Sequence, residues 1–339
     1  MTVCVKWTLN PISLLSLPWD KLVLWEQAVY GKIYLTRRPA SEILPDCICG
    51  SPFVKNSWGS SSRCPSFAAT LRAARPNIPG PGCNMDNYVE QFCGCNCQPN
   101  CEPISCLCIK QQGLNYQNGC LLEKIICGDS SKAILECNSK CSCHRACSNR
   151  LVQNGIKYKL EVFTVKNKGL ALRTLETIPR GSFVCEYAGE IVSEEEANKR
   201  SKKLTKDDMN YLFVLNEHCA SGIIQTFIDP KYKGNIGRMI NHSCDPNLTM
   251  YPVRINNSIP RLALFANTDI KLLEELSFSY GSSSNCDTDK SVNTKACYCG
   301  ATMCMKYLPF DTSVFLGRVC LKYSICQRIQ NVIEIAAQN

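Results

Sequence analysis

Twelve of the chain's 26 cysteines fall between Cys93 and Cys147, a segment with little of the apolar periodicity from which a hydrophobic core is built. Such a segment needs another source of folding free energy, and bonds between thiolates and a metal ion supply it. Cys-x-Cys and Cys-x3-Cys spacings bring neighbouring thiols to one ion more easily than they allow pairing with distant partners. The segment is therefore predicted to fold around metal ions.

Nine of these cysteines form two regular groups, with the spacings Cys-x-Cys-x3-Cys-x4-Cys-x-Cys and Cys-x3-Cys-x-Cys-x3-Cys. Three tetrahedral zinc ions need twelve Zn–S bonds, so nine terminal ligands are too few. Twelve Zn–S bonds are reached when three of the nine thiolates each bridge two ions and the other six each bind one. We therefore expect three structural zinc ions with no open coordination position, bound by Cys95, Cys97, Cys101, Cys106, Cys108, Cys137, Cys141, Cys143 and Cys147.

A second set of four thiols lies in the C-terminal half. Cys244 sits in the polar turn Asn-His-Ser-Cys-Asp-Pro-Asn, and Cys297, Cys299 and Cys304 follow with Cys-x-Cys-x4-Cys spacing. Four thiolates close a tetrahedral structural zinc site. Because Asn241 and His242 stand beside Cys244, this fourth zinc is expected to hold the C-terminal end of the chain over a binding pocket.

Composition narrows the class of protein. A chain of 339 residues can bury a sizeable core, and no convincing signal-peptide cleavage site follows the apolar stretch Ile12–Trp19, so a secreted disulfide scaffold is the weaker account of the cysteines. No stretch is long and apolar enough to span a bilayer, and an intracellular, reducing compartment is expected. The net charge of +9 is compatible with non-specific DNA contact, but the positive residues are scattered.

From Lys157 onward the sequence changes to short β-rich runs separated by Gly, Pro, Asn and charged turns, which predicts several small sheets rather than a parallel αβ sandwich. Ser193 followed by Glu196 predicts a helix start with a capping box, and the tail Val314–Ala337 is predicted to form a docked helix. The predicted strands are Tyr158–Val165, Ser182–Tyr187, Tyr211–Leu215, Gln225–Ile228, Leu262–Ala266 and Leu276–Tyr280.

Together, the nine-cysteine module, the Asn-His-Ser-Cys turn and the terminal Cys-x-Cys-x4-Cys motif resemble the pre-SET, SET and post-SET regions of histone-lysine N-methyltransferases. The resemblance covers roughly residues 93–310. It is closest to the branch in which a SET methyltransferase is fused to a mariner transposase, although no transposase part is expected in this chain. The resemblance rests on the sequence segments Cys185-Glu-Tyr-Ala-Gly-Glu190, Gly234-Asn-Ile-Gly-Arg238, Pro252-Val-Arg-Ile255, Leu262-Ala-Leu-Phe-Ala266 and Leu308-Pro-Phe-Asp311.

The resemblance implies a mainly β, pseudoknotted SET fold, S-adenosylmethionine as methyl donor, and a lysine of the histone H3 tail or nucleosome as acceptor, in the nucleus and on chromosomes. It divides the chain into an unassigned region 1–92, a pre-SET module 93–150, a SET domain 151–285, a post-SET flap 286–308 and a tail 309–339. By family motif, the cofactor would contact Lys168, Gly169, Leu170, Tyr211, Arg238, Asn241 and His242. The site of the reacting lysine would be formed by Tyr187, Tyr211, Phe278 and Tyr280, with Tyr280 as the tyrosine usually called catalytic.

Residue chemistry is consistent with this assignment. A free lysine amine has a pKa of about 10.4, and an apolar, aromatic channel helps deliver its neutral, nucleophilic form. Aromatic faces also tolerate a methylammonium product. Phe278 lies two residues before Tyr280, on the same strand face, and resembles the family position where Phe leaves room for further methyl groups. Di- or trimethyllysine is therefore the expected product.

Two departures from the family pattern leave an alternative open. The cofactor loop reads Gly-Leu-Ala rather than Gly-x-Gly, so the Cβ of Ala171 is expected to crowd the cofactor or to prevent a positive φ. Ser279 replaces the acidic residue that usually precedes the tyrosine. A catalytically weakened SET domain that serves as a chromatin-binding scaffold is the second hypothesis. A zinc-dependent nucleic-acid binder without catalysis is the third, which the scattered charge does not favour.

Overall fold

The computed structural model describes residues 76–128, 133–205, 208–219, 222–281 and 295–309, together with the three short strands at 25–29, 32–36 and 322–324. Contacts divide the chain into two units, Met1–Ala69 and Thr70–Asn339. In the first unit, β1 (Trp25–Val29) and β2 (Lys32–Thr36) form an antiparallel hairpin. All the other elements described below belong to the second unit. None of the helices in the described residues is long and apolar enough to cross a membrane.

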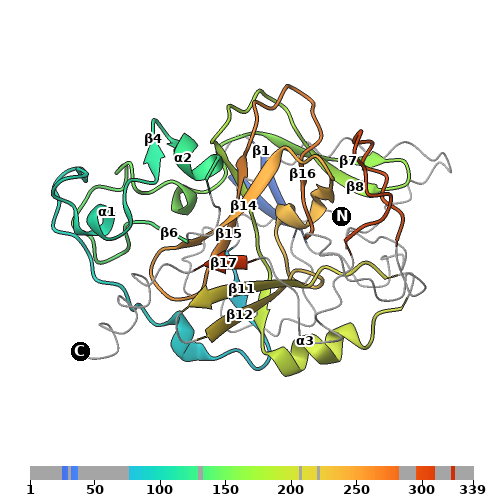
Figure 1. Cartoon of the computed structure of the whole chain (residues 1–339), viewed down its shortest axis with the longest axis horizontal. Helices are drawn as coiled ribbons and strands as arrows, with labels where there is room; N and C mark the ends of the chain where they lie inside the picture. The colour runs from blue at the N-terminus through green and yellow to red at the C-terminus, as the bar shows by residue number, and fades with distance from the viewer. Residues whose placement is uncertain are drawn as a thin grey trace. The chain divides into compact units, whose positions relative to one another are not determined.

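The second unit is built mainly from small sheets, as the sequence predicted (Figure 1). One sheet has five strands in the order β17 (Lys322–Ser324), β11 (Phe213–Cys219), β12 (Gly222–Asp229), β10 (Glu190–Val192) and β3 (Ile78–Pro79). The other has the order β13 (Asn241–His242), β16 (Ser277–Phe278), β14 (Leu248–Arg254), β15 (Arg261–Ala266) and β9 (Phe183–Tyr187), with β6 (Ile134–Leu135) also paired to β14. Two hairpins complete the β structure: β4 (Tyr116–Gln117) with β5 (Cys120–Leu121), and β7 (Leu160–Val165) with β8 (Gly169–Thr174).

Each of the six predicted strands coincides with an observed strand over part of its length. Helical elements are few and short: α1 (Leu107–Gln112), α2 (Glu123–Ile126) and α3 (Glu194–Ser201), with 3-10 turns at η4 (Met85–Tyr88), η5 (Val152–Asn154) and η6 (Ile236–Met239). The predicted C-terminal helix lies outside the described residues except at Lys322–Ser324, which are a strand parallel to β11. The helix prediction is therefore wrong at these three residues, where pairing with a sheet edge overrides local periodicity.

The helix start predicted at Ser193 is observed, but its capping box is only half formed. Ser193 caps α3 by accepting a hydrogen bond from the backbone N–H of Glu196 at 3.3 Å. The Glu196 carboxylate instead pairs with Arg200 one turn later. Arg200 also reaches the nearly buried carboxylates of Glu190 and Asp229, so the side chain of Glu196 serves an ion-pair network rather than the cap.

The core lies where β9, β14 and β15 are buried along nearly their whole length. Two buried ion pairs tie these strands to their surroundings. Arg254 on β14 makes a bidentate pair with Glu217 on β11, at 2.8 and 2.6 Å, which connects the two large sheets. Arg261 on β15 pairs with Glu186 on β9. Bidentate geometry satisfies both carboxylate oxygens, which is what makes a buried charge tolerable.

Segment 235–244 passes unusually close to β9. A Cβ built on Gly237 would lie 2.1 Å from the carbonyl oxygen of Glu186, so only glycine fits this approach. The side chain of Asn235 accepts hydrogen bonds from the backbone N–H groups of Ala188 and Gly237. The segment then continues into β13, which pairs in parallel with β16, with Asn241 opposite Ser277 and His242 opposite Phe278. These contacts bring the Asn-His-Ser-Cys turn beside the strand that carries Phe278.

The cysteine module is anchored to the chain that follows it by one buried acid. The carboxylate of Glu136, which is fully buried, accepts hydrogen bonds from the Tyr116 hydroxyl and from the backbone N–H groups of Leu151 and Val152. Gln153 adds a side-chain N–H donor at 2.8 Å. Because Glu136 directly precedes Cys137, this set of donors fixes the module's chain against the rest of the unit.

Candidate active site and metal centres

All nine cysteines predicted for the first cluster gather in one place, and they are free thiols. The Sγ atoms form three overlapping groups of four, within which all sulfurs lie within 4.8 Å of one another. Cys95, Cys101 and Cys143 each belong to two groups and Cys137 to all three, which makes four shared thiols where three bridging ligands were expected. Cys108 joins through a 3.7 Å contact with the Sγ of Cys141, and Cys97 packs against the cluster without belonging to a group. The three groups are Cys95–Cys101–Cys106–Cys137, Cys95–Cys137–Cys141–Cys143 and Cys101–Cys137–Cys143–Cys147.

The distances between the sulfurs and the hydrogen-bond donors around them are both those expected for sulfurs that bind a metal ion. A tetrahedral ion with Zn–S bonds of about 2.3 Å places its sulfurs about 3.8 Å apart, and the Sγ atoms of Cys95 and Cys137 lie 3.5 and 3.6 Å from that of Cys101. Backbone and side-chain N–H groups donate to several sulfurs, including Asn138 N to Cys141, Asn149 Nδ2 to Cys137 and Arg150 Nη2 to Cys143. Such donors stabilise and orient metal-bound thiolates.

The second predicted set, Cys244, Cys297, Cys299 and Cys304, also converges, with all four Sγ atoms within 4.8 Å of one another. The flap is folded tightly around them. The N–H of Met305 donates to the Sγ of Cys244 at 3.4 Å, and the N–H of Cys297 donates to the carbonyl of Lys306 at 2.8 Å. Cys244 comes from the Asn-His-Ser-Cys turn, so an ion here would join the flap to that turn.

His242 links this sulfur site to Tyr280. Its Nδ1 accepts a hydrogen bond from the backbone N–H of Tyr280 at 3.2 Å, so Nε2 carries the proton and faces the Sγ of Cys244 at 3.4 Å. Burial lowers the pKa of the imidazole and favours this neutral form. Both ring nitrogens are thus engaged within the chain.

The predicted channel residues form an aromatic cluster. The ring of Phe278 lies 5.9 Å from that of Tyr187 and 5.0 Å from that of Tyr280. Both phenols donate to backbone carbonyls, Tyr187 to Tyr211 at 2.6 Å and Tyr280 to Ile240 at 2.9 Å. Burial raises the pKa of both phenols above the ordinary value, so both remain protonated at neutral pH.

Tyr211 and Arg238 lie beside this cluster. The guanidinium carbon of Arg238 is 5.9 Å from the centroid of the Tyr211 ring, and its Nη1 donates to the carbonyls of Pro230 and Lys231. Arg238 is therefore fixed by the loop after β12, with the ring of Tyr211 near its charged end. The four aromatic residues predicted from the sequence are brought together in this part of the molecule.

The β7–β8 turn carries the other predicted cofactor residues. Asn167 and Gly169 have positive φ angles, 67° and 76°, whereas Ala171 does not. The Ala171 side chain is fully buried within β8, so its Cβ does not project into an open cavity. The side-chain amide of Asn241 donates to the carbonyl of Leu170 at 3.1 Å, which ties the turn to β13. Pairing with Phe163 gives Ala171 an ordinary φ, so this position does not adopt the positive φ that a Cβ would prevent.

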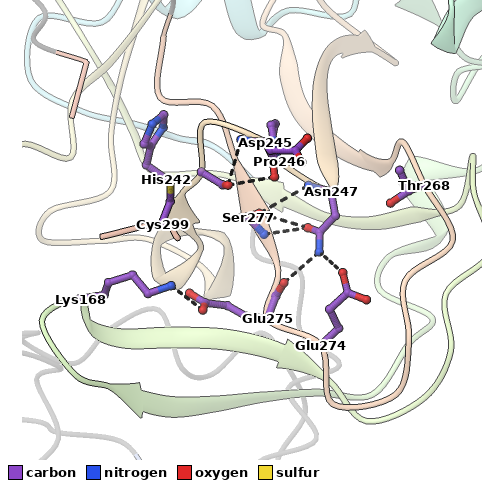
Figure 2. Close-up of a pocket in the computed structure, with 11 residues that line it drawn as sticks. Lys168, His242, Asp245, Pro246, Asn247, Thr268, Glu274, Glu275, Ser277 and Cys299 are labelled. Carbon is purple, nitrogen blue, oxygen red and sulfur yellow. Dashed lines mark hydrogen bonds and ion pairs between the residues drawn. The ribbon is translucent and has the colours of Figure 1, made fainter. Parts of the chain in front are cut away.

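A cavity of about 330 Å³ opens between this turn, the Asn-His-Ser-Cys turn and the flap. Figure 2 shows Lys168 and His242 among its lining residues, with Cys299 of the flap beside them. The other predicted cofactor residues (Gly169, Leu170, Tyr211, Arg238 and Asn241) do not line it. Asp245, Asn247, Glu275 and Ser277 also line the cavity and were not predicted as site residues, although Asp245 and Asn247 belong to the polar turn that contains Cys244.

Comparisons with known proteins agree with this arrangement. Residues 169–281 match the SET domain family. The chain is 44% identical over 251 residues to the mouse (Mus musculus) histone-lysine N-methyltransferase SETMAR, which covers 71% of this chain and 81% of that protein. The crystal structure of the methyltransferase domain of human SETMAR is similar with a TM-score of 0.60 and 41% identity, covering 70% of this chain and 88% of that one.

A more distant structure carries ligands. KRYPTONITE, crystallised in complex with DNA, a histone H3 peptide and SAH, is 32% identical with a TM-score of 0.51, covering 69% of this chain and 45% of that one. The similarity to SETMAR spans most of the mouse protein. The chain therefore belongs to the SET-domain family of histone-lysine N-methyltransferases.

Proposed function

We propose that this protein transfers a methyl group from S-adenosylmethionine to a lysine of the histone H3 tail, on free histone or on the nucleosome, in the nucleus and on chromosomes. The observation that carries the proposal is the parallel pairing of β13 with β16, which places His242 opposite Phe278. It sets the aromatic cluster directly beside the predicted cofactor residues. The histone H3 peptide and SAH bound by KRYPTONITE support the choice of acceptor and donor.

In this proposal Lys168, Gly169, Leu170, Asn241 and His242 form the cofactor site, with Tyr211 and Arg238 at its edge. S-adenosylmethionine, when bound, supplies a methyl group on a sulfonium. The chain's own residues position the acceptor amine and exclude water. The rings of Tyr187 and Phe278 disfavour the charged ammonium, so the amine reacts in its neutral form. The phenol of Tyr280, fixed by the carbonyl of Ile240, orients that amine.

The metals in this proposal are structural. Three zinc ions would occupy the nine-cysteine cluster of the pre-SET module, residues 93–150. A fourth would occupy the site of Cys244 and the three flap cysteines, where it closes the post-SET flap, residues 286–308, over the cofactor site. The overlapping thiol groups and the N–H donors to sulfur support both assignments.

Nothing in the described site favours the weakened scaffold. Ala171 has an ordinary φ and a buried Cβ. Ser279, just after β16, is exposed, and its hydroxyl donates to the carbonyl of Gly281 at 3.0 Å.

The first prediction tests the function. The native chain should transfer labelled methyl groups from S-adenosylmethionine to a histone H3 peptide, and Tyr280→Phe should lower turnover about a hundredfold or more because the amine loses a positioned polar partner. Cofactor affinity should change little. Tyr251→Phe is the matched control, since this buried phenol also donates to a backbone carbonyl but lies in a different part of the core. Unchanged turnover in Tyr280→Phe would make Tyr280 a core residue only.

The second prediction concerns the product. Phe278→Tyr should shift the product from di- or trimethyllysine toward monomethyllysine, because a hydroxyl beside Tyr187 and Tyr280 would hold water or the amine and restrict its rotation. Product masses and a thermal melt of the same variant should be measured together. A lower melting temperature with an unchanged product ratio would show that Phe278 acts only as a buried strand residue.

The third prediction concerns the flap. Cys244→Ser should remove one zinc ion per chain and weaken SAH binding, since an open flap no longer closes the cofactor site. Zinc content and calorimetric affinity are the measurements. Cys127→Ser is the control, because Cys127 is exposed and belongs to neither thiol group. Full zinc content in Cys244→Ser would refute this ligand assignment.

A further inference from the structure

Glu275 occupies a fixed position at the wall of the cavity. It immediately precedes Leu276, whose N–H donates to the carbonyl of Leu172 at 2.8 Å, and its own backbone bridges to Arg173 of β8. Its carbonyl also accepts a hydrogen bond from the side-chain amide of Asn247. The backbone of Glu275 is therefore fixed on the β7–β8 hairpin, and Figure 2 shows its side chain pointing toward Lys168.

The two carboxylate oxygens of Glu275 hold different walls of the proposed cofactor site. Oε2 pairs with the Nζ of Lys168 at 2.5 Å, on the β7–β8 turn. Oε1 accepts a hydrogen bond from the Nδ2 of Asn241 at 3.3 Å, on β13. The same Nδ2 donates to the carbonyl of Leu170, so three elements meet at this amide.

This ion pair differs from an ordinary surface pair. The side chains of Lys168 and Glu275 are 15% and 24% exposed, so solvent screens them less than most lysine–glutamate pairs. The turn that carries Lys168 contains two residues with positive φ, Asn167 and Gly169, and its conformation is fixed from outside by Asn241 and Glu275. Replacement of one carboxylate oxygen by an amide nitrogen, as in Glu275→Gln, would leave a single acceptor where Lys168 and Asn241 now have one each.

We propose that Glu275 is a positioning residue for the cofactor site, an inference that rests on the proposed function and deepens it. Glu275 holds Lys168 and Asn241 at the separation the cofactor requires, and it acts through these two residues rather than on the reacting atoms. A different role would be direct attraction between the carboxylate and the positive sulfonium. The two roles separate experimentally, because SAH carries a neutral thioether in place of the sulfonium.

The test compares Glu275→Gln with the native, zinc-loaded chain. Calorimetric titration should show that S-adenosylmethionine and SAH both bind about tenfold more weakly, by the same factor, as expected when one member of a coupled polar network changes. KM for the donor should rise by a similar factor. The kcat at saturating donor and histone H3 peptide should stay within about twofold, since a positioning residue outside the reacting centre alters binding more than chemistry.

Glu161→Gln is the matched control. It removes a cross-strand ion pair with the Arg173 side chain on the same β7–β8 hairpin, at 2.7 Å, and leaves the backbone bridge between Arg173 and Glu275 in place, so both affinities should stay unchanged. Weaker binding of S-adenosylmethionine alone would assign Glu275 to charge attraction and overturn the positioning role. Unchanged binding of both ligands, or equal losses in Glu161→Gln, would also overturn it. A native chain that neither binds SAH nor methylates the peptide would instead refute the proposed function itself.

Discussion

The rest of the structure depends on the convergence of cysteine sulfur atoms. This convergence is a constraint because no apolar core lies beneath the sulfurs. In the cysteine module, buried Sγ atoms lie within 4.8 Å of one another in three overlapping groups, and N–H donors are directed at several of them. Such an arrangement suits thiolates, and buried like charges need a cation among them. The module pairs with a large sheet through β6 and β14, and the carboxylate of Glu136 accepts hydrogen bonds from Tyr116 and from the chain after Arg150. The proposed zinc cluster would therefore fix the chain that leads into the catalytic unit.

Converging thiols recur towards the other end of the unit, where they adjoin the proposed cofactor and lysine sites. Cys244 belongs both to the second thiol group and to the turn after β13, and His242 connects its sulfur to the backbone of Tyr280. A displaced flap would disturb the imidazole, which is hydrogen-bonded to the backbone of Tyr280, two residues after Phe278 of β16. The proposed metal, cofactor and lysine sites are consequently coupled through one short segment, Asn241–Cys244, and Glu275 extends that coupling to the β7–β8 turn.

Features whose physical cause is local were predictable from the sequence. The thiol groups follow from cysteine spacing, and the strands follow from β-rich runs between turn residues, because both depend on near neighbours in the chain. Glu275 was not predicted, since its importance arises from Lys168 and Asn241, 107 and 34 residues away in sequence. Strand β17 was predicted as helix because periodicity cannot anticipate an open edge on β11. The ordinary φ of Ala171 has a related cause: strand pairing with Phe163 sets its backbone.

If thiolate-bound metal holds both the fold and the cofactor site, removal of the metal should abolish both. Native mass spectrometry of the purified chain, followed by stepwise chelation with near-ultraviolet circular dichroism and SAH titration, measures all three quantities on one sample. The account predicts about four zinc ions per chain, with SAH binding lost and the cysteine module unfolded once the metal is removed. A metal-free chain that keeps its tertiary signal and binds SAH with native affinity would contradict it.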